Sequence, residues 1–154
     1  MGSVEAVLAE AERSSAVTHD HPEGIRGAQA VALAVFLART GSTKEDIRTE
    51  LRNRIGYPLD RTLDEIRPHY RFDVSCQGSV PEAITAVLES DDLEHAIRLA
   101  ISLGGDADTQ ACIAGGIAEA FYGPVSRELE QEAVARLPGK FVETYGAFRD
   151  RYSR

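Results

Sequence analysis

Two glycines, two carboxylates and a hydroxyl group lie within one short segment of the second half of the chain. The segment reads Gly104-Gly105-Asp106-Ala107-Asp108-Thr109, and a run of small and apolar residues follows it. Oxygens at positions i, i+2 and i+3 of a helix start can face one point, and hard cations such as Mg²⁺ bind carboxylate, hydroxyl and water oxygens. The two glycines allow unusual backbone angles and the close approach of a ligand. One interpretation is therefore a cation site.

The same residues also have a purely structural interpretation. Asp106 or Asp108 can cap the helix that follows and complement its dipole without binding any ligand. Spacing alone does not separate a helix cap from a cation site, so both interpretations stay open at this point.

A second polar segment, Thr18-His19-Asp20-His21-Pro22-Glu23-Gly24, precedes a long helical pattern. Asp20 or His21 can cap that helix, and Pro22 suits its first turn because the missing N–H would be unpaired there anyway. The two histidines therefore either cap the helix at the surface or contribute to a ligand site.

The spacing of apolar residues predicts helices along the whole chain, with short loops, no strand-type alternation and no repeats. We expect an all-α fold in a single domain, residues 1–154. Two capping boxes are predicted to start helices, one formed by Ser42 with Glu45 and one by Ser79 with Glu82. The expected helices cover residues 4–13, 22–39, 42–54, 62–70, 79–90, 93–103, 108–122, 126–135 and 139–151.

Composition limits the classes of partner. The chain has 154 residues, of which 43% are hydrophobic and 27% charged, and its formal net charge is −8. This charge argues against binding nucleic acid or an anionic membrane through a basic surface. The longest apolar run, residues 28–38, is too short to span a bilayer. The N-terminal residues do not resemble a signal peptide, and Cys76 and Cys112 follow no ligand spacing, so we expect a cytoplasmic protein with a buried, inert Cys112 thiol.

Taken together, the motifs resemble the ADP-ribosylglycohydrolase family. In that family a Gly-Gly-Asp-x-Asp-Thr segment supplies three ligands to a pair of Mg²⁺ ions. The segment 18–24, followed by Gly27-Ala28-Gln29-Ala30, is similar to the family's Thr-His-Asn-His-Pro-Glu helix start, with Asp20 in place of the asparagine. Residues 76–83, Cys-Gln-Gly-Ser-Val-Pro-Glu-Ala, are similar to its characteristic loop and helix. The resemblance covers about Val4 to Tyr122.

The resemblance implies an orthogonal helical bundle like the C-terminal half of the family's fold. It also implies Mg²⁺-dependent hydrolysis of the glycosidic bond between ADP-ribose and an acceptor on a protein or small molecule. Asp108 is the implied bridging ligand and catalytic residue. The resemblance further assigns metal binding to Asp106, Asp108 and Thr109, and substrate binding to His19, Gly104 and Gly105.

Family members are commonly longer, and their N-terminal half carries a Thr-Asp-Asp ligand segment and a Gly-Asn-Gly-Ser-like phosphate loop. Neither motif occurs in this sequence. Because a two-metal site needs several negative oxygens, half of such a site should hold Mg²⁺ weakly. Three expectations follow: a partner polypeptide supplies the missing half, a second copy of the chain covers the same surface, or the chain is a non-catalytic all-α binding or interaction module that retains half of the metal site.

Overall fold

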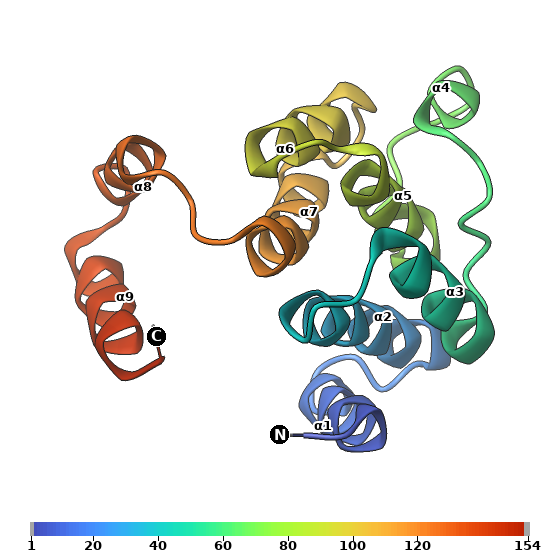
Figure 1. Ribbon diagram of the computed structural model, residues 1–154, viewed down its shortest axis with the longest axis horizontal. Helices are drawn as coiled ribbons and strands as arrows, with labels where there is room; N and C mark the ends of the chain where they lie inside the picture. The colour runs from blue at the N-terminus through green and yellow to red at the C-terminus, as the bar shows by residue number, and fades with distance from the viewer. Residues whose placement is uncertain (1, 153–154) are drawn as a thin grey trace. The chain divides into compact units, whose positions relative to one another are not determined.

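The computed structural model describes residues 2–152, and within that range the secondary structure is entirely helical (Figure 1). The predicted all-α fold class is confirmed. The helices are α1 (Val4–Ala16), α2 (Pro22–Arg39), α3 (Lys44–Ile55), α4 (Leu63–Ile66), α5 (Cys76–Glu89), α6 (Leu93–Ser102), α7 (Ala107–Tyr122), α8 (Arg127–Val134) and α9 (Gly139–Tyr152).

The chain divides into two compact units. The first, Met1–Gly123, contains α1 to α7, and the second, Pro124–Arg154, contains α8 and α9. The sequence predicts one domain over residues 1–154, and this prediction is not tested by the division into compact units.

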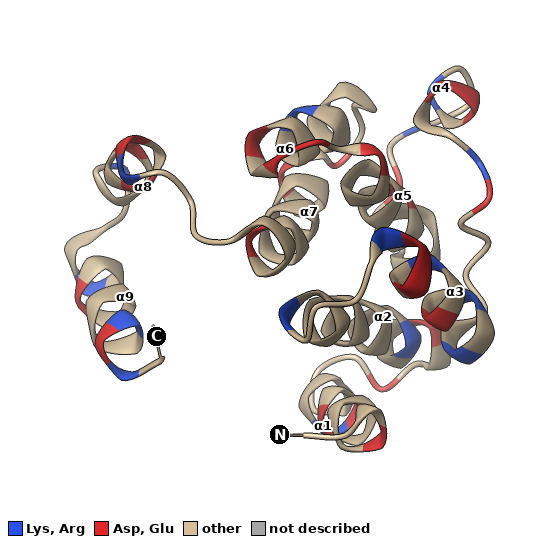
Figure 2. Cartoon of the chain, in the orientation of Figure 1, with Lys and Arg blue, Asp and Glu red and all other residues tan. Residues whose placement is uncertain are grey.

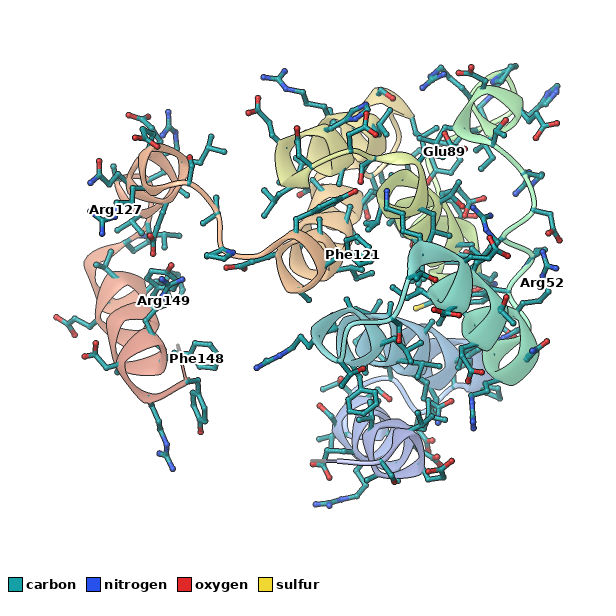
Figure 3. The ribbon with its side chains drawn as sticks, in the orientation of Figure 1. Arg52, Glu89, Phe121, Arg127, Phe148 and Arg149 are labelled. Atoms are coloured by element: carbon teal, nitrogen blue, oxygen red, sulfur yellow. The ribbon has the colours of Figure 1, made fainter. Side chains whose placement is uncertain are left out.

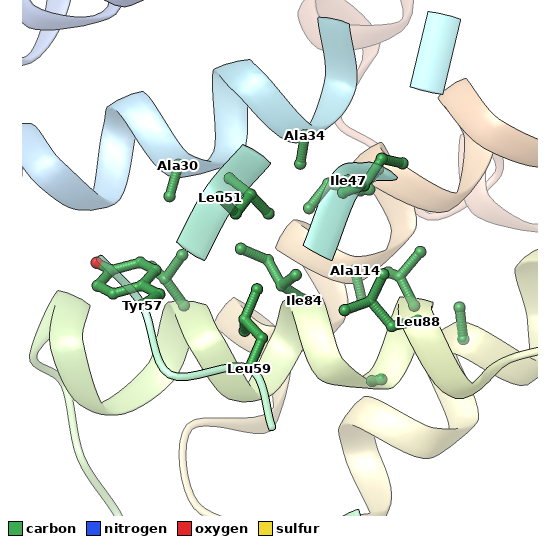
Figure 4. Close-up of a cluster of buried hydrophobic side chains, with 14 of the residues drawn as sticks. Ala30, Ala34, Ile47, Leu51, Tyr57, Leu59, Ile84, Leu88 and Ala114 are labelled. Carbon is green, nitrogen blue, oxygen red and sulfur yellow. The ribbon is translucent and has the colours of Figure 1, made fainter. Parts of the chain in front are cut away.

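Helix α5 is the most deeply buried element of the first unit. Every residue from 79 to 88 is buried, and α5 packs against α2, α3, α4, α6 and α7. Figure 4 shows Ile84 and Leu88 of this helix facing Leu51 of α3 and Ala114 of α7. Burial on all sides is the pattern of a central helix. The helix is therefore held in place by its buried residues 79–88, which pack into the unit's core.

Helices α2 and α7 each bury one stripe of small residues. On α7 the buried residues are Gln110, Ala114, Ile117 and Ala118, which have the spacing of a single helix face. On α2, a β-carbon added to Gly27 would lie 2.8 Å from Cβ of Cys76 at the start of α5. The first turns of α2 and α5 therefore approach so closely that only glycine fits at this position.

The capping box of α3 lies one residue later than predicted. Thr43 caps the helix by accepting from the N–H of Asp46 at 3.1 Å, and the Asp46 carboxylate accepts from the N–H of Thr43 at 3.0 Å. The prediction of Ser42 with Glu45 was wrong because Ser42 belongs to the preceding turn, where its N–H donates to the carbonyl of Leu37 at 3.0 Å.

Helix α5 begins earlier than the second predicted capping box. Its N-cap is Ser75, whose hydroxyl accepts from the N–H of Gly78 at 3.2 Å, so Ser79 is already inside the helix. Pro81 lies in the second turn, where its missing N–H removes a single helical hydrogen bond. Glu82 is consequently a buried core residue instead of a capping residue.

Cys112 also departs from its prediction. It is exposed, because it falls on the face of α7 opposite the buried stripe that Gln110 and Ala114 define. The chemical expectation of an inert buried thiol therefore does not apply to this cysteine.

Helices α8 and α9 of the second unit bury none of their residues. The Tyr145 hydroxyl on α9 donates to Glu130 on α8, and Arg149 lies 3.7 Å from the same carboxylate. Figure 3 shows Phe148 projecting from α9, and its ring packs against that of Tyr152 with centroids 4.9 Å apart. Polar contacts and exposed aromatic rings thus characterise this unit.

Acidic and basic side chains are interspersed on helices such as α3 (Figure 2). In the part of the chain that the structure describes, none of the helices combines the length and apolar character needed to cross a bilayer.

Candidate metal and ligand site

The turn between α6 and α7 is made by two consecutive glycines in the left-handed region. Gly104 has φ +76° and Gly105 has φ +68°, backbone angles that residues other than glycine rarely adopt. A β-carbon added to Gly105 would also lie 2.7 Å from Cε1 of Tyr70. The turn therefore needs glycine at Gly105 for two reasons, its backbone angle and its close contact with a neighbouring ring.

Asp106 occupies the N-cap position of α7 but its side chain does not cap the helix. Its backbone has φ −80° and ψ 65°, its carbonyl accepts from the N–H of Gln110 at 3.1 Å, and its carboxylate makes no capping hydrogen bond. An N-cap aspartate usually accepts from the first turn of the helix. The capping interpretation is therefore not supported for Asp106, whose carboxyl group hydrogen-bonds with that of Asp108 instead.

The second carboxylate lies beside the first. Hydrogen bonding with the Asp106 carboxyl group lowers the pKa of Asp108 most, and the backbone N–H groups of Thr109 and Asp108 lower it further. Asp108 and Thr109 are exposed and Asp106 is half-buried. The structure thus brings the three predicted ligands together on one turn, with the Asp108 carboxylate ionised at neutral pH.

The chemistry of these donors fits Mg²⁺ in kind. Carboxylate and hydroxyl oxygens are hard ligands, and the ion commonly completes its octahedron with water. Residues 2–152 contain no group of three or more His, Cys, Asp or Glu side chains that could hold a metal.

His19 lies in the loop between α1 and α2, where its side chain is exposed. Its Nδ1 shares a 2.8 Å hydrogen bond with the Thr18 hydroxyl, and its carbonyl accepts from the N–H of His21 at 2.8 Å. His21 caps α2 by accepting from the N–H of Glu23 at 3.2 Å. These hydrogen bonds all stay within the loop and the first turn of α2, so His19 is not joined by them to the Asp106 turn.

A pocket of about 300 Å³ lies beside the glycine turn. Tyr70 and Phe72 line it and also approach Gly105, which places the pocket next to the predicted ligands. Its complete lining is Arg61, Ile66, His69, Tyr70, Arg71, Phe72, Asp73, Gly78 and Glu82.

Glu82 is the buried carboxylate of this pocket. Its side chain is 8% exposed, one oxygen lies 3.0 Å from Arg61, and Oε2 has no hydrogen-bond partner among the described residues. Burial raises the pKa of Glu82, and the charge of Arg61 opposes that shift only in part.

Sequence reasoning missed Tyr70, Gln110 and Glu82. For Gln110 a signal was available, because it has the helical spacing of the buried residues Ala114 and Ile117 and is the one polar member of that stripe. For Tyr70 no local signal existed, since its contacts with the glycine turn come from a distant part of the chain.

Comparison with known families shows the family to which the chain belongs. The family model described as ADP-ribosylglycohydrolase matches residues 1–150. The chain belongs to the ADP-ribosylglycohydrolase family.

Curated relatives agree with this assignment to the ADP-ribosylglycohydrolases. The chain is 32% identical over 146 residues to an ADP-ribosylarginine hydrolase Tri1 of Pseudomonas putida, a match that covers 92% of this chain and 37% of the relative. It is 29% identical over 166 residues to the human ADP-ribosylhydrolase ARH3, with 79% of this chain and 46% of the relative covered. The chain thus spans less than half the length of these relatives.

A solved structure supports the same fold. The structure, described as an ADP-ribosylglycohydrolase-related protein complex, matches with a TM-score of 0.61 and 23% sequence identity over 86% of this chain and 45% of that chain. At this identity the match shows the ADP-ribosylglycohydrolase fold alone.

Proposed function

We propose that this chain is part of an Mg²⁺-dependent ADP-ribosylglycohydrolase that hydrolyses the glycosidic bond between ADP-ribose and an acceptor. The observation that carries the proposal is the Asp106 carboxylate, which occupies an N-cap position without capping the helix and lies beside the ionised Asp108. Family membership supplies the class of reaction.

Each predicted residue has a role in this proposal. Asp106, Asp108 and Thr109 would hold Mg²⁺, and Asp108 would be the residue most needed for catalysis. When bound, the ion would orient the ribose hydroxyls and polarise the attacking water. His19 and the backbone of Gly104 and Gly105 would contact ADP-ribose, as the family resemblance implies. Glycine allows the close approach of a ligand, and a β-carbon added to Gly104 would meet no atom within 4 Å.

The proposal includes a source for the rest of the site. The described residues offer two neighbouring carboxylates, and the chain covers 37% of the length of the Pseudomonas putida relative. A partner polypeptide would supply the remaining ligands and the phosphate-binding loop, or a second copy of the chain would cover the surface that the missing half occupies in longer relatives. The substrate would be an ADP-ribosylated protein or small molecule.

The function can be tested on the purified chain of 154 residues. ADP-ribose release is measured from ADP-ribosylated arginine and serine peptides, with Mg²⁺ and with EDTA, and Mg²⁺ binding is measured separately by calorimetry. Because the proposal places the remaining ligands on a partner, we expect the chain alone to bind Mg²⁺, with binding lost in Asp108→Ala. If the chain releases ADP-ribose without a further polypeptide, release should depend on Mg²⁺ and fall about 100-fold in Asp108→Ala, the order of effect of removing one group from an electrostatic site. Asp150→Ala, which removes an exposed carboxylate on α9, is the matched control and should leave release unchanged.

Two other outcomes distinguish the alternatives. Mg²⁺ binding that is lost in Asp108→Ala, without ADP-ribose release, would indicate a metal half-site that needs a partner, and light scattering would show whether that partner is a second copy. If the chain shows no ADP-ribose release and no Mg²⁺ binding, the proposal is contradicted.

A non-catalytic all-α binding or interaction module is the second candidate. Its supporting observation is the lack of a group of three metal-binding side chains in residues 2–152. In that case ADP-ribose, or an ADP-ribosylated peptide, would bind with the same affinity in EDTA and in Mg²⁺.

A further inference from the structure

The ligand turn of α7 is contacted on both sides by one tyrosine from a distant loop. On the N-terminal side, the edge of the Tyr70 ring lies against Gly105, so closely that a β-carbon there would be 2.7 Å from Cε1. On the C-terminal side, the Tyr70 hydroxyl accepts a hydrogen bond from Nε2 of Gln110. Asp106, Asp108 and Thr109 all lie between these two contacts.

Both contacts are anchored. Gln110 is 0% exposed, and its backbone N–H donates to the carbonyl of Asp106 at 3.1 Å, so its side chain and backbone link Tyr70 to the start of α7. The N–H of Tyr70 donates to the carbonyl of Ile66 at 3.0 Å, which fixes the tyrosine to the end of α4. The two anchors restrict the position of the segment between them.

The electrostatic interactions agree with this placement. Burial raises the pKa of Tyr70, and the negative charges of Glu82, Asp73 and Asp106 raise it further. Tyr70 therefore stays a neutral hydroxyl group that can accept from Gln110, while its ring lies near the charge of Asp106.

We infer that Tyr70 is a positioning residue that holds residues 105–110 in the geometry required for the carboxylates of Asp106 and Asp108 to bind a divalent cation. This inference rests on the proposed function for the identity of the cation. The physical reason is that ligand oxygens must be fixed closely for a site of few ligands to bind at all. Hydrophobic packing alone would fix α7 as a whole, whereas Tyr70 fixes its first turn.

The test compares two Tyr→Phe variants of the full chain. Tyr70→Phe keeps the ring against Gly105 and removes the hydroxyl that Gln110 binds. Tyr122→Phe is the matched control. Tyr122 lies at the C-terminal end of α7, far from the ligand turn, and its hydroxyl donates to the carbonyl of Ser90. The first readout is hydrogen exchange of the Gln110 backbone N–H in the absence of metal, which does not depend on activity. The second is the Kd for Mn²⁺, a spectroscopic substitute for Mg²⁺.

Tyr70→Phe should speed exchange at Gln110 and weaken Mn²⁺ binding, each about fivefold beyond the control, which is the effect of losing one hydrogen bond. In a double-mutant cycle with Gln110→Met, the two effects should be non-additive because both changes break the same bond. Equal exchange in the two Tyr→Phe variants, or additive effects in the cycle, would overturn the inference. If the wild-type chain binds no Mn²⁺, the proposed metal site is contradicted, while the exchange comparison still decides whether Tyr70 fixes the turn.

Discussion

At the scale of single residues, the first unit combines a small-residue core with a few buried polar groups. Glu82 and Gln110 each bury a side-chain oxygen that has no hydrogen-bond partner among the described residues. Such an oxygen costs about 1–3 kcal/mol relative to a satisfied one. Both residues lie close to Tyr70, one in the pocket that it lines and one hydrogen-bonded to its hydroxyl. Two of the buried unpartnered oxygens therefore lie near the candidate site, and the other two in the described residues belong to Glu23 and Tyr57.

Glu82 gives a prediction about pH. Burial raises its pKa in the folded protein above the ordinary value of 4.5, so folding favours the protonated form. The stability that this provides is complete below pH 4.5 and is lost as the pH rises through the raised pKa. In Glu82→Gln the side chain stays neutral at every pH. The Tm of the variant minus the Tm of the wild type should therefore increase from pH 4 to pH 8. Thermal unfolding followed by circular dichroism checks this prediction.

The control is Glu12→Gln, which replaces an exposed carboxylate on α1. Its Tm should run parallel to that of the wild type at every pH. A Glu82→Gln curve that is also parallel to wild type would show that the buried carboxylate does not titrate differently in the folded state.

At the scale of elements, local capping decides where several helices begin. Helices α3 and α4 both start with a capping box, formed by Thr43 with Asp46 and by Thr62 with Glu65. Helix α4 is further tied to α5, because Glu89, labelled in Figure 3, accepts from the N–H of Leu63 at 3.0 Å. The loop that follows α4 carries Tyr70. These caps therefore help to place the residue that contacts the ligand turn.

The corrected cap of α3 can be tested directly. Thr43→Ala removes the hydroxyl that accepts from Asp46 and should lower the free energy of unfolding by about 1 kcal/mol. Ser42→Ala, the residue that the sequence pattern favoured, should change it by only a few tenths of a kcal/mol, as for most surface substitutions. Urea unfolding of both variants gives the comparison. A larger loss in Ser42→Ala than in Thr43→Ala would contradict the cap seen in the structure.

At the scale of the whole molecule, the buried apolar core belongs to one unit. All buried hydrophobic residues, from Ala30 to Ala118, lie within the first unit, whereas α8 and α9 bury none of theirs. Fully burying a Leu or Ile side chain stabilises a fold by about 1.5–3 kcal/mol. The first unit therefore has its own source of stability, and the second has little beyond surface contacts.

This division predicts the effect of truncation. A chain ending at Gly123 should unfold in a single cooperative transition, because it keeps the complete core cluster. A peptide of residues 124–154 should be mostly unfolded, since short helices without buried contacts are marginal in water. Circular dichroism with thermal melting measures both. A truncated chain that melts without cooperativity would show that the first unit cannot fold alone.

The sequence by itself determined the helical class, the bounds of α2, the family and the turn that carries Asp106 and Asp108. These features are encoded locally, in the 3.6-residue period, in glycine pairs and in motifs of adjacent residues. The sequence pattern misplaced the cap of α3 because Ser42 and Thr43 are equivalent until the preceding turn uses one of them. It misplaced the cap of α5 because the helix begins one turn earlier, at Ser75, and the Ser79 hydroxyl donates to the Ser75 carbonyl inside the helix.

Only the tertiary structure decided how the candidate turn is supported. The bond between Gln110 and Tyr70 joins residues 40 positions apart, and the contact between Gly27 and Cys76 joins two different helices. No local pattern predicts such pairs, because they depend on how the helices pack. The side chain of Asp106 likewise departs from its local pattern: its sequence position allowed a cap, and in the fold its carboxyl group hydrogen-bonds with Asp108 instead.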